Sequence, residues 1–407
     1  MPAEKESRPS AREASAEDGP APEAAPLPEA AVILGRTGLE VWCMTPADRF
    51  RRQLGRAGLT QLIDDAALVG HDGALLLLRS DAVIDGPLLQ ALLRAPGAVL
   101  LSNGAPAGVP LAVHAPAGLA AAAAEVLRGE ALPAALPEGL RGVTSGDLGA
   151  SYWQALRKRE EPYALMLRPE ALKAIEWRMF MGTYKGATDF VTKWFWPRPA
   201  SVVTRLCARL GITPNQVTAL SALLTVAAFY WFWEGNWLPG LLAAWGMTFL
   251  DTVDGKLARI TLQSSKWGNV FDHGIDLIHP PFWYWAWGVG LQQGPWAVSG
   301  EQLWLMLAVI VGGYVLQRVI EGIAIWRLGL EIHVWRKVDT WFRLFTARRN
   351  PNLVLLTLSV LAGRPDLGLA AVAVWTGVCL ALHVLQLGQG LVAARHGKLR
   401  SWMAGPA

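Results

Sequence analysis

Six apolar stretches in the second half of the sequence constrain the fold more than any other feature. A helix that crosses a bilayer needs about 20 apolar residues, and all the stretches except the short fifth one approach or exceed that length. Such a helix satisfies its own backbone hydrogen bonds inside lipid. We therefore expect an α-helical membrane domain with six transmembrane helices, at residues 215–233, 238–262, 267–291, 302–326, 351–363 and 368–392.

The connections between these stretches differ in charge. Residues 234–238 and 291–301 contain only Glu234 and Glu301 as charged residues, whereas residues 327–350 contain six arginines and lysines. Basic residues also follow the last stretch, at 395–400. Because Lys and Arg gather in cytoplasmic loops, we expect both termini in the cytoplasm and the protein in the cytoplasmic, or inner, membrane.

Composition supports a membrane protein. Of the residues, 52% are hydrophobic and 17% are charged, and there are 20 tryptophans. An average soluble protein has about 25% charged residues, so an ordinary cytosolic enzyme, a coiled coil and a disordered chain are excluded. The basic residues flank apolar stretches, which argues against a nucleic-acid partner despite the pI of about 9.0. The three cysteines lie far apart, so neither a disulfide framework nor a zinc site is indicated.

The first part of the chain has the opposite charge balance. Residues 1–150 contain 18 acidic and 12 basic residues, whereas residues 151–407 contain 15 and 25. This difference predicts a cytosolic domain in front of the membrane domain of residues 214–395, with a cytosolic tail at 396–407. Residues 1–28 are mostly Ala, Pro, Glu and Ser, so we expect a disordered tail there.

Residues 29–160 alternate short apolar runs with helical stretches. Such alternation predicts a small α/β domain with a parallel sheet. The expected strands lie at 30–34, 73–78, 97–102 and 109–114, and the expected helices lie at 47–58, 86–94 and 119–128.

Residues 161–213 form a linker in which Trp and Phe alternate with Lys and Arg. From Ser201 the apolar residues recur at helical spacing, with Arg205 and Arg209 on a polar face. This pattern predicts an interfacial helix on an anionic membrane surface; the alternative is an amphipathic helix packed on the soluble domain.

Four carboxylates interrupt the second and third apolar stretches. Asp251 and Asp254 are three residues apart, and Asp272 and Asp276 are four residues apart, so each pair shares one helix face. A tight turn at 263–266 makes the two helices antiparallel neighbours, which allows all four side chains to converge. Because each charge at the centre of a bilayer helix costs about 3 kcal/mol, the carboxylates need a cation or a wet cleft.

Oxygen ligands of this kind suit Mg²⁺ or Mn²⁺, and four carboxylates can hold two ions. Two divalent ions on a diphosphate are a common device for phosphoryl transfer. Gly255 and Gly268 allow close approach of helix and ligand, Ala258 stays small, and Arg259 can hold phosphate oxygens.

The stretch from Asp251 to Asp276 resembles the signature of the CDP-alcohol phosphotransferase family, D-x2-D-G-x2-A-R-x8-G-x3-D-x3-D, at all eight specified positions. Residues 213–218, with Asn215 and Thr218, are similar to the T-P-N-x-x-T that precedes it in the family. The resemblance covers about residues 185–395. It implies transfer of a substituted phosphate from a CDP-linked donor to an alcohol acceptor, with release of CMP, in phospholipid or polar-lipid synthesis.

The resemblance also implies roles for individual residues. Asp251, Asp254, Asp272 and Asp276 would bind the two ions, and Asp276 would also act as the general base. The expected nucleotide-binding residues are Gly255, Ala258, Arg259, Asn215, Thr218 and Gly268. Membrane lipids and a second copy of the chain, as a homodimer, are further partners that the family implies.

Two subfamilies are suggested. Residues 271–276 are similar to the F-D-H-G-x-D of choline and ethanolamine phosphotransferases. The overall plan resembles the bifunctional inositol-phosphate cytidylyltransferase/di-inositol-phosphate-phosphate synthases, with a nucleotidyltransferase-like, Rossmann-like front domain. Here that domain keeps only Arg36 of a basic phosphate loop, so we expect it to be degenerate. The donor, CDP-diacylglycerol or a CDP-headgroup, stays open.

Two alternatives from other classes remain. The intramembrane carboxylates could belong to a cation-coupled transporter, or the front domain could be an active cytidylyltransferase. Two further roles are left open. The Arg318–Glu321 pair could neutralise itself or bind an acceptor. Arg348 and Arg349 could bind a phosphate or anchor the fifth helix.

Overall fold

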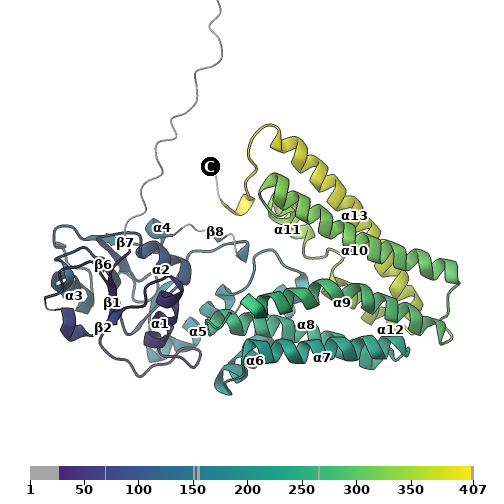
Figure 1. Cartoon of the computed structure of the whole chain (residues 1–407), viewed down its shortest axis with the longest axis horizontal. Coiled ribbons are helices and arrows are strands. Elements are labelled where there is room, and N and C mark those ends of the chain that lie inside the picture. The colour runs from purple at the N-terminus through teal and green to yellow at the C-terminus, as the bar shows by residue number, and fades with distance from the viewer. Residues whose placement is uncertain (1–26, 69, 150–151, 154–155, 265, 405–407) are drawn as a thin grey trace, which may run out of the picture.

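The computed structural model describes residues 27–404 except 69, 150–151, 154–155 and 265, and leaves undescribed the side chains of 67, 152–153, 266–267 and 269–273. An α/β domain lies at one end of the molecule, and a bundle of long helices lies at the other (Figure 1). The expected disordered tail at 1–28 falls almost wholly outside the described residues.

The α/β domain contains a six-stranded sheet in the order β2-β1-β3-β6-β5-β7. The expected strands at 30–34, 73–78, 97–102 and 109–114 are present as β1, β3, β5 and β6. The prediction of a parallel sheet is wrong, since β6 runs antiparallel to both β3 and β5. Only eight residues connect β5 to β6, fewer than the dozen or more that a parallel crossover needs. The strands are β1 (Ala30–Leu34), β2 (Leu62–Ile63), β3 (Leu75–Arg79), β5 (Ala98–Leu101), β6 (Pro110–Ala115) and β7 (Arg141–Val143).

Helices cover both faces of this sheet. Leu76 and Leu78 of β3 pack against α1 (Pro46–Arg56) and α2 (Gly86–Leu92). Leu75 and Leu77 point to the opposite face and pack against α3 (Ala120–Arg128). All four leucines are fully buried, as the alternation of side chains along a strand requires. The domain is therefore a three-layer α/β structure, and its three helices lie where the sequence predicts them.

Short elements connect the α/β domain to the helical bundle. Strand β10 (Ala164–Met166) pairs antiparallel with β4 (Ala82–Ile84), so the chain returns to the α/β domain after residue 160. The remaining short elements are α4 (Ser145–Leu148), β8 (Tyr152–Trp153), β9 (Lys158–Arg159), α5 (Leu172–Gly182), α6 (Pro197–Arg209) and α11 (Lys337–Phe342).

Six helices occupy the positions of the six expected spans. Among the described residues, three of them, α7, α10 and α13, are long and apolar enough to cross a membrane. Helix α12 has only 13 residues, and α8 carries charged residues in its last turns. The count of six spans therefore stays a prediction. The helices are α7 (Pro214–Trp233), α8 (Trp237–Ile260), α9 (Lys266–Gln292), α10 (Gly300–Leu328), α12 (Arg349–Leu361) and α13 (Pro365–Ala394).

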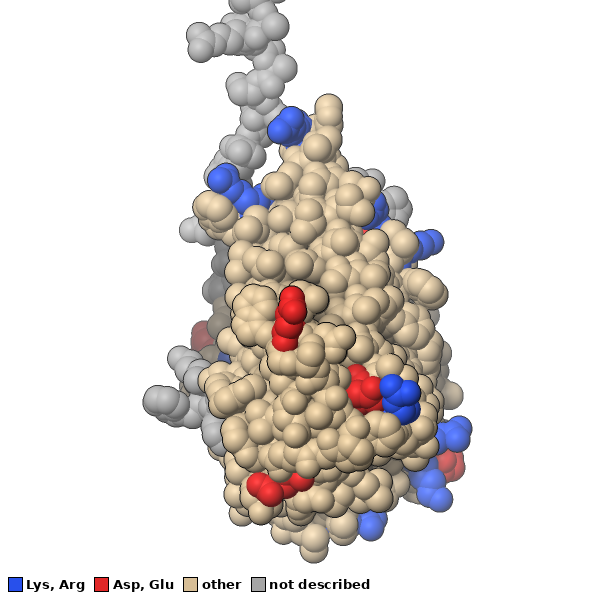
Figure 2. All heavy atoms as spheres, turned by 90° about the vertical axis from the view of Figure 1, so that its right-hand side faces the viewer, with Lys and Arg blue, Asp and Glu red and all other residues tan. Residues whose placement is uncertain are grey.

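The bundle has an aromatic core and an apolar exterior. Helix α7 packs against α8 and α9, and α10 packs against α13. Phe232, Trp237, Trp283 and Trp287 lie in one buried or half-buried cluster, so these aromatic residues serve packing. The end of the bundle remote from the α/β domain shows few charged side chains (Figure 2).

Helix α6 lies where the interfacial helix is expected. It exposes Val202, Leu206 and Leu210, with relative accessibilities of 67%, 53% and 65%, and it also packs against α8. Arg205 does not face lipid headgroups as expected, because its guanidinium lies over the ring of Trp42 and pairs with Glu176 of α5 at 2.7 Å. The helix thus combines one protein-packed face with one exposed apolar face.

Helices α7 and α9 approach closely at one end of the bundle, and this contact depends on Gly290. A Cβ at residue 290 would lie 2.1 Å from the carbonyl oxygen of Phe232. Small residues permit such approaches in membrane bundles.

We expect Gly290→Ala to lower the thermal unfolding midpoint in detergent by several degrees, since overpacking costs about 1–3 kcal/mol. Gly312→Ala in α10 is the matched control, because a Cβ there meets nothing within 4 Å. Equal midpoints for the two variants would contradict this account of the contact.

Candidate functional site

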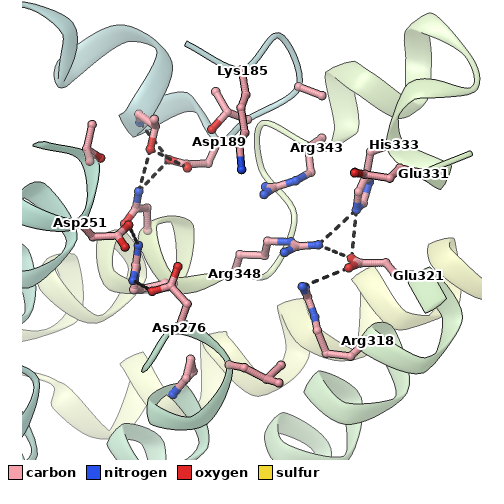
Figure 3. A pocket seen from close by; sticks show the side chains of 18 of the residues that line it. Lys185, Asp189, Asp251, Asp276, Arg318, Glu321, Glu331, His333, Arg343 and Arg348 are labelled. Carbon is pink, nitrogen blue, oxygen red and sulfur yellow. Dashed lines mark hydrogen bonds and ion pairs between the residues drawn. The ribbon is translucent and has the colours of Figure 1, made fainter. Parts of the chain in front are cut away.

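A polar cavity of about 730 Å³ lies among α8, α9, α10 and α12 and the segment before α6. Its lining is dominated by charged side chains from segments far apart in the sequence, as Figure 3 shows. Asp251, Gly255, Ala258, Arg259 and Asp276 of the predicted site line it together.

Asp251 of α8 and Asp276 of α9 are bridged by a single guanidinium. Arg349, the first residue of α12, donates to Asp251 Oδ2 at 2.5 Å and to Asp276 Oδ1. Figure 3 shows the two labelled carboxylates turned toward one another. The expected convergence of the two helices is therefore present for this pair. Arg349 compensates both charges, a role that differs from the phosphate-binding and anchoring roles considered for it.

Asp254 lies one turn after Asp251 and is held by Thr218. The Thr218 hydroxyl donates to Asp254 Oδ2 at 2.6 Å, while Oδ1 is buried without a hydrogen-bond partner among the described residues. Thr218 is placed by the start of α7, where Thr213 and Gln216 form a capping box and Pro214 occupies the first turn. The T-P-N-x-x-T motif thus positions a residue that contacts a signature carboxylate.

The structure gives fewer contacts for the remaining predicted site residues. Asp272 lies in α9, one turn before Asp276, but its side chain is outside the described residues. Asn215 is exposed, and neither it nor Gly268 is among the described residues that line the cavity. Their predicted nucleotide contacts therefore stay predictions.

The carboxylates fit a divalent cation. Asp251 and Asp276 already hold one positive group between two helices, and the buried Asp254 Oδ1 lacks a partner in the described part of the chain. Carboxylate oxygens are the ligands that Mg²⁺ and Mn²⁺ prefer. Asp251, Asp254 and Asp276, with Asp272 from the same helix face as Asp276, are the residues that would hold such ions.

Arg259 lies beside its helix glycine at the cavity wall. A Cβ at residue 255 would approach Arg259 Nη2 to 3.0 Å. A larger residue at this position would therefore push the guanidinium away from its present place. The pairing of Gly255 with Arg259 in the signature has a steric reason.

A second charged network lies on the far side of the cavity, around Glu321 of α10. Arg318 pairs with Glu321 at 3.0 Å, so the expected neutralising pair is present. Arg348 and His333 also contact the same carboxylate (Figure 3). Burial lowers the pKa of His333 to about 3, which makes this histidine neutral at physiological pH. One carboxylate thus pairs with two guanidiniums, so this group of side chains keeps a net positive charge.

Several cations that line the cavity were not found from the sequence. Arg343 and Lys185, both labelled in Figure 3, are two of them. The Arg343 Nε and Nη1 atoms are buried without a partner among the described residues. Burial and neighbouring guanidiniums lower the pKa of Lys185. Arg343 lies in the basic connection before α12, which was a usable signal, whereas Lys185 lies in a linker with no motif.

Two acidic residues that follow strands of the α/β domain, Asp81 and Asp85, have structural partners. Arg79 binds Asp81 through two hydrogen bonds of 2.9 Å and also donates to the carbonyl of Gly129 after α3. Asp85 caps α2 by accepting from the Gly86 amide at 2.9 Å. Burial raises the pKa of Asp85 to about 6. These partners account for both carboxylates without a bound nucleotide.

Comparison with known proteins identifies the class of the helical part. Residues 211–383 match the model of the CDP-alcohol phosphatidyltransferase family. This part of the chain is similar to the CDP-alcohol phosphatidyltransferase domain that the model describes.

Two relatives with assigned names are similar to parts of the chain. The chain is 44% identical over 80 residues to the archaetidylinositol phosphate synthase of Pyrococcus horikoshii, covering 19% of this chain and 42% of that one. It is 30% identical over 90 residues to the phosphatidylinositol phosphate synthase of Mycobacterium marinum, covering 22% and 38%. The matched segments thus span less than half the length of these relatives.

Among solved structures, the phosphatidylinositol phosphate synthase of Mycobacterium tuberculosis with CDP-DAG bound is similar, with a TM-score of 0.38 and 17% identity, covering 47% of this chain and 94% of that chain. A second structure of that protein, in complex with manganese and citrate, has a TM-score of 0.36 and 16% identity, covering 46% and 88%.

The bridge made by Arg349 yields a prediction about metal-dependent stability. In Arg349→Gln two close carboxylates lose their shared cation, and removing one partner of a buried ion pair costs about 3–5 kcal/mol. We expect a clearly lower unfolding midpoint in EDTA, and a larger gain on adding Mn²⁺ than the unmodified protein shows, because the ion replaces the guanidinium. Thermal unfolding in detergent measures both.

Arg364→Gln is the control, since Arg364 pairs with Asp366 in an exposed ion pair at the other end of the bundle. If Mn²⁺ stabilised Arg349→Gln no more than the unmodified protein, this would show that Arg349 and the ion do not compete for Asp251 and Asp276.

Proposed function

We propose that the protein transfers a phosphatidyl-type group from a CDP-linked lipid to an alcohol that itself carries a phosphate, with release of CMP. The observation that carries the proposal is the meeting of Asp251 and Asp276, from two helices, around one cation at a polar cavity of a CDP-alcohol phosphatidyltransferase domain. Cytoplasmic termini in an inner membrane and a homodimer are part of the proposal.

The donor side of the cavity contains the signature residues of α8. The names of the matched relatives, which are synthases of inositol-phosphate lipids, support a CDP-linked lipid rather than a CDP-headgroup. Arg259 would hold the diphosphate through paired N–H donors, and Gly255 would leave room for it. Divalent ions on the four carboxylates would neutralise negative charge on the diphosphate.

The reacting hydroxyl must lose its proton as its oxygen attacks the β-phosphorus and the bond to the CMP oxygen breaks. The Asp276 side chain is 41% exposed and lines the cavity, so it can reach that hydroxyl. We assign Asp276 as the general base, since a positioned carboxylate is effective despite its low basicity in water. The four helices around the cavity would limit competing attack by water.

The acceptor side of the cavity is basic. Arg343 offers two buried N–H groups without partners in the described chain, and Lys185 lines the same cavity (Figure 3). Buried donors of this kind favour a charged, hydrogen-bonding ligand. A phosphate on the acceptor alcohol, far enough from the reacting hydroxyl to lie at Arg343, satisfies this requirement.

The base assignment predicts that Asp276→Asn lowers CMP release by at least a thousandfold while CDP-lipid binding changes little. The amide keeps the shape of the side chain but cannot accept the proton. CMP release by purified protein in Mn²⁺, and donor binding measured separately, test this. Asp366→Asn, remote from the cavity, should behave like the unmodified protein, and full turnover by Asp276→Asn would remove Asp276 from this role.

The proposed acceptor site predicts that a substitution of Arg343 changes the KM for the acceptor. Arg343→Gln should raise the KM for a phosphorylated polyol acceptor about ten- to a hundredfold, since hydrogen bonds to charged groups contribute about 1.5–3 kcal/mol. The KM for the CDP-lipid should change less than threefold. Arg327→Gln, an exposed residue beside Trp326, is the control, and equal use of phosphorylated and unphosphorylated acceptors by the unmodified protein would contradict the site.

The same assay separates the alternatives. A cation-coupled transporter would produce no CMP from any CDP-alcohol. An active cytidylyltransferase in the α/β domain would release pyrophosphate from CTP and an alcohol phosphate, including in the Asp276→Asn variant. We favour a degenerate α/β domain because its Asp81 and Asp85 already bind structural partners.

A further inference from the structure

Three arginines of the α/β domain contact the end of the helix that carries the first half of the signature. Arg49, Arg52 and Arg56 lie at positions i, i+3 and i+7 of α1 and therefore share one face. Their guanidiniums donate to the carbonyl of Ile260 at 2.8 Å, to the carbonyl of Thr261 at 2.7 Å and to the hydroxyl of Ser264 at 2.9 Å. We call these three residues the arginine row.

The contacted segment is the end of α8 and the turn into α9. The last carbonyls of a helix lack intrahelical partners, and positive groups at a helix C-terminus interact favourably with its dipole. Leu262 in this turn has a left-handed φ of 56°, which surrounding contacts must stabilise in a residue other than glycine. The arginine row supplies such contacts on both sides of Leu262.

An apolar contact supports the same docking. Val41 and Trp42, in the loop between β1 and α1, share a buried cluster with Val253, Leu257 and Ile260 of α8. Trp42 is 2% exposed, and its backbone and indole N–H groups both donate to Glu176 at 3.0 Å. The loop after β1, where a nucleotidyltransferase-like domain would hold phosphates, is thus used here for attachment to α8.

The contacted segment connects the two halves of the carboxylate cluster. Asp254 and Arg259 lie in the last two turns of α8, and Asp272 and Asp276 follow in the first three turns of α9. The turn between them sets the distance and the angle between the end of α8 and the start of α9. A contact that fixes this turn therefore also fixes the spacing of the two pairs of carboxylates.

We propose that the α/β domain is a positioning module for the transferase domain, and that the arginine row holds the α8–α9 turn in the geometry that the metal-binding carboxylates require. The expected effect on catalysis rests on the proposed function. The restraint on the turn does not depend on that function. Arg49, Arg52 and Arg56 are positioning residues, since they contact the turn rather than a substrate.

The test uses the full-length protein in detergent, with Arg52→Gln, Arg56→Gln and the double variant. Arg49 is buried and is left unchanged to protect folding. Arg51→Gln is the matched control, because Arg51 is exposed on another side of α1 and pairs with Asp48 of the same helix. Arg52→Lys, which keeps the charge and one donor, tests rescue.

The first readout is amide hydrogen exchange of residues 261–276, which needs neither substrate nor activity. We expect the double variant to exchange at least tenfold faster there, with exchange in β3 and α3 unchanged, and Arg52→Lys to recover most of the protection. Exchange within twofold of the unmodified protein would overturn the proposal. Equal acceleration across the whole α/β domain would also overturn it, because that result indicates general unfolding.

The second readout is Mn²⁺ affinity together with CMP release. We expect the double variant to bind Mn²⁺ about five- to tenfold more weakly and to lose kcat with little change in the KM for the acceptor, while Arg51→Gln stays within twofold. Faster exchange with unchanged Mn²⁺ affinity would overturn the link to the carboxylates. Absence of CMP release from the unmodified protein would refute the proposed function, and the exchange experiment would still decide on the arginine row.

Discussion

The need to keep several carboxylates charged inside a helical bundle shapes the rest of this structure. Asp251 and Asp276 share the guanidinium of Arg349, and Asp254 is held by the Thr218 hydroxyl. These partners come from α12 and α7, so the contacts of the carboxylates join α7, α8, α9 and α12. An uncompensated charge in such a place would cost several kcal/mol, which makes the arrangement a condition of folding as well as of chemistry.

The sequence predicted those parts of the site that depend on one helix at a time. The spacing of Asp251 and Asp254, and of Asp272 and Asp276, fixes a shared face on α8 and on α9. Both helices pack against α7, and Arg349 links Asp251 to Asp276. The partner roles of Arg349 and Thr218, by contrast, depend on how α12 and α7 pack, and no local pattern contains that information. The antiparallel β6 was missed for a related reason, because apolar runs indicate strands without giving their direction.

Guanidiniums outnumber the carboxylate around Glu321 in the cavity. Arg318 and Arg348 both pair with Glu321. Arg318, Arg343 and Arg348 each keep at least one buried N–H group without a partner among the described residues. Unmatched donors in a buried place cost free energy unless a ligand satisfies them, so the basic side is where an anionic group of a substrate is most favourable.

The α/β domain fits the same physical account. Its Asp81 and Asp85 bind Arg79 and the Gly86 amide, while Trp42 and the arginine row of α1 are directed to the bundle. The β1–α1 region of this domain contacts α8, as the proposed attachment requires. Because the attached segment lies between Asp254 and Asp272, attachment at this point restrains the part of the bundle whose geometry the carboxylates depend on. The soluble domain and the membrane domain therefore act as one structural unit at the turn between α8 and α9.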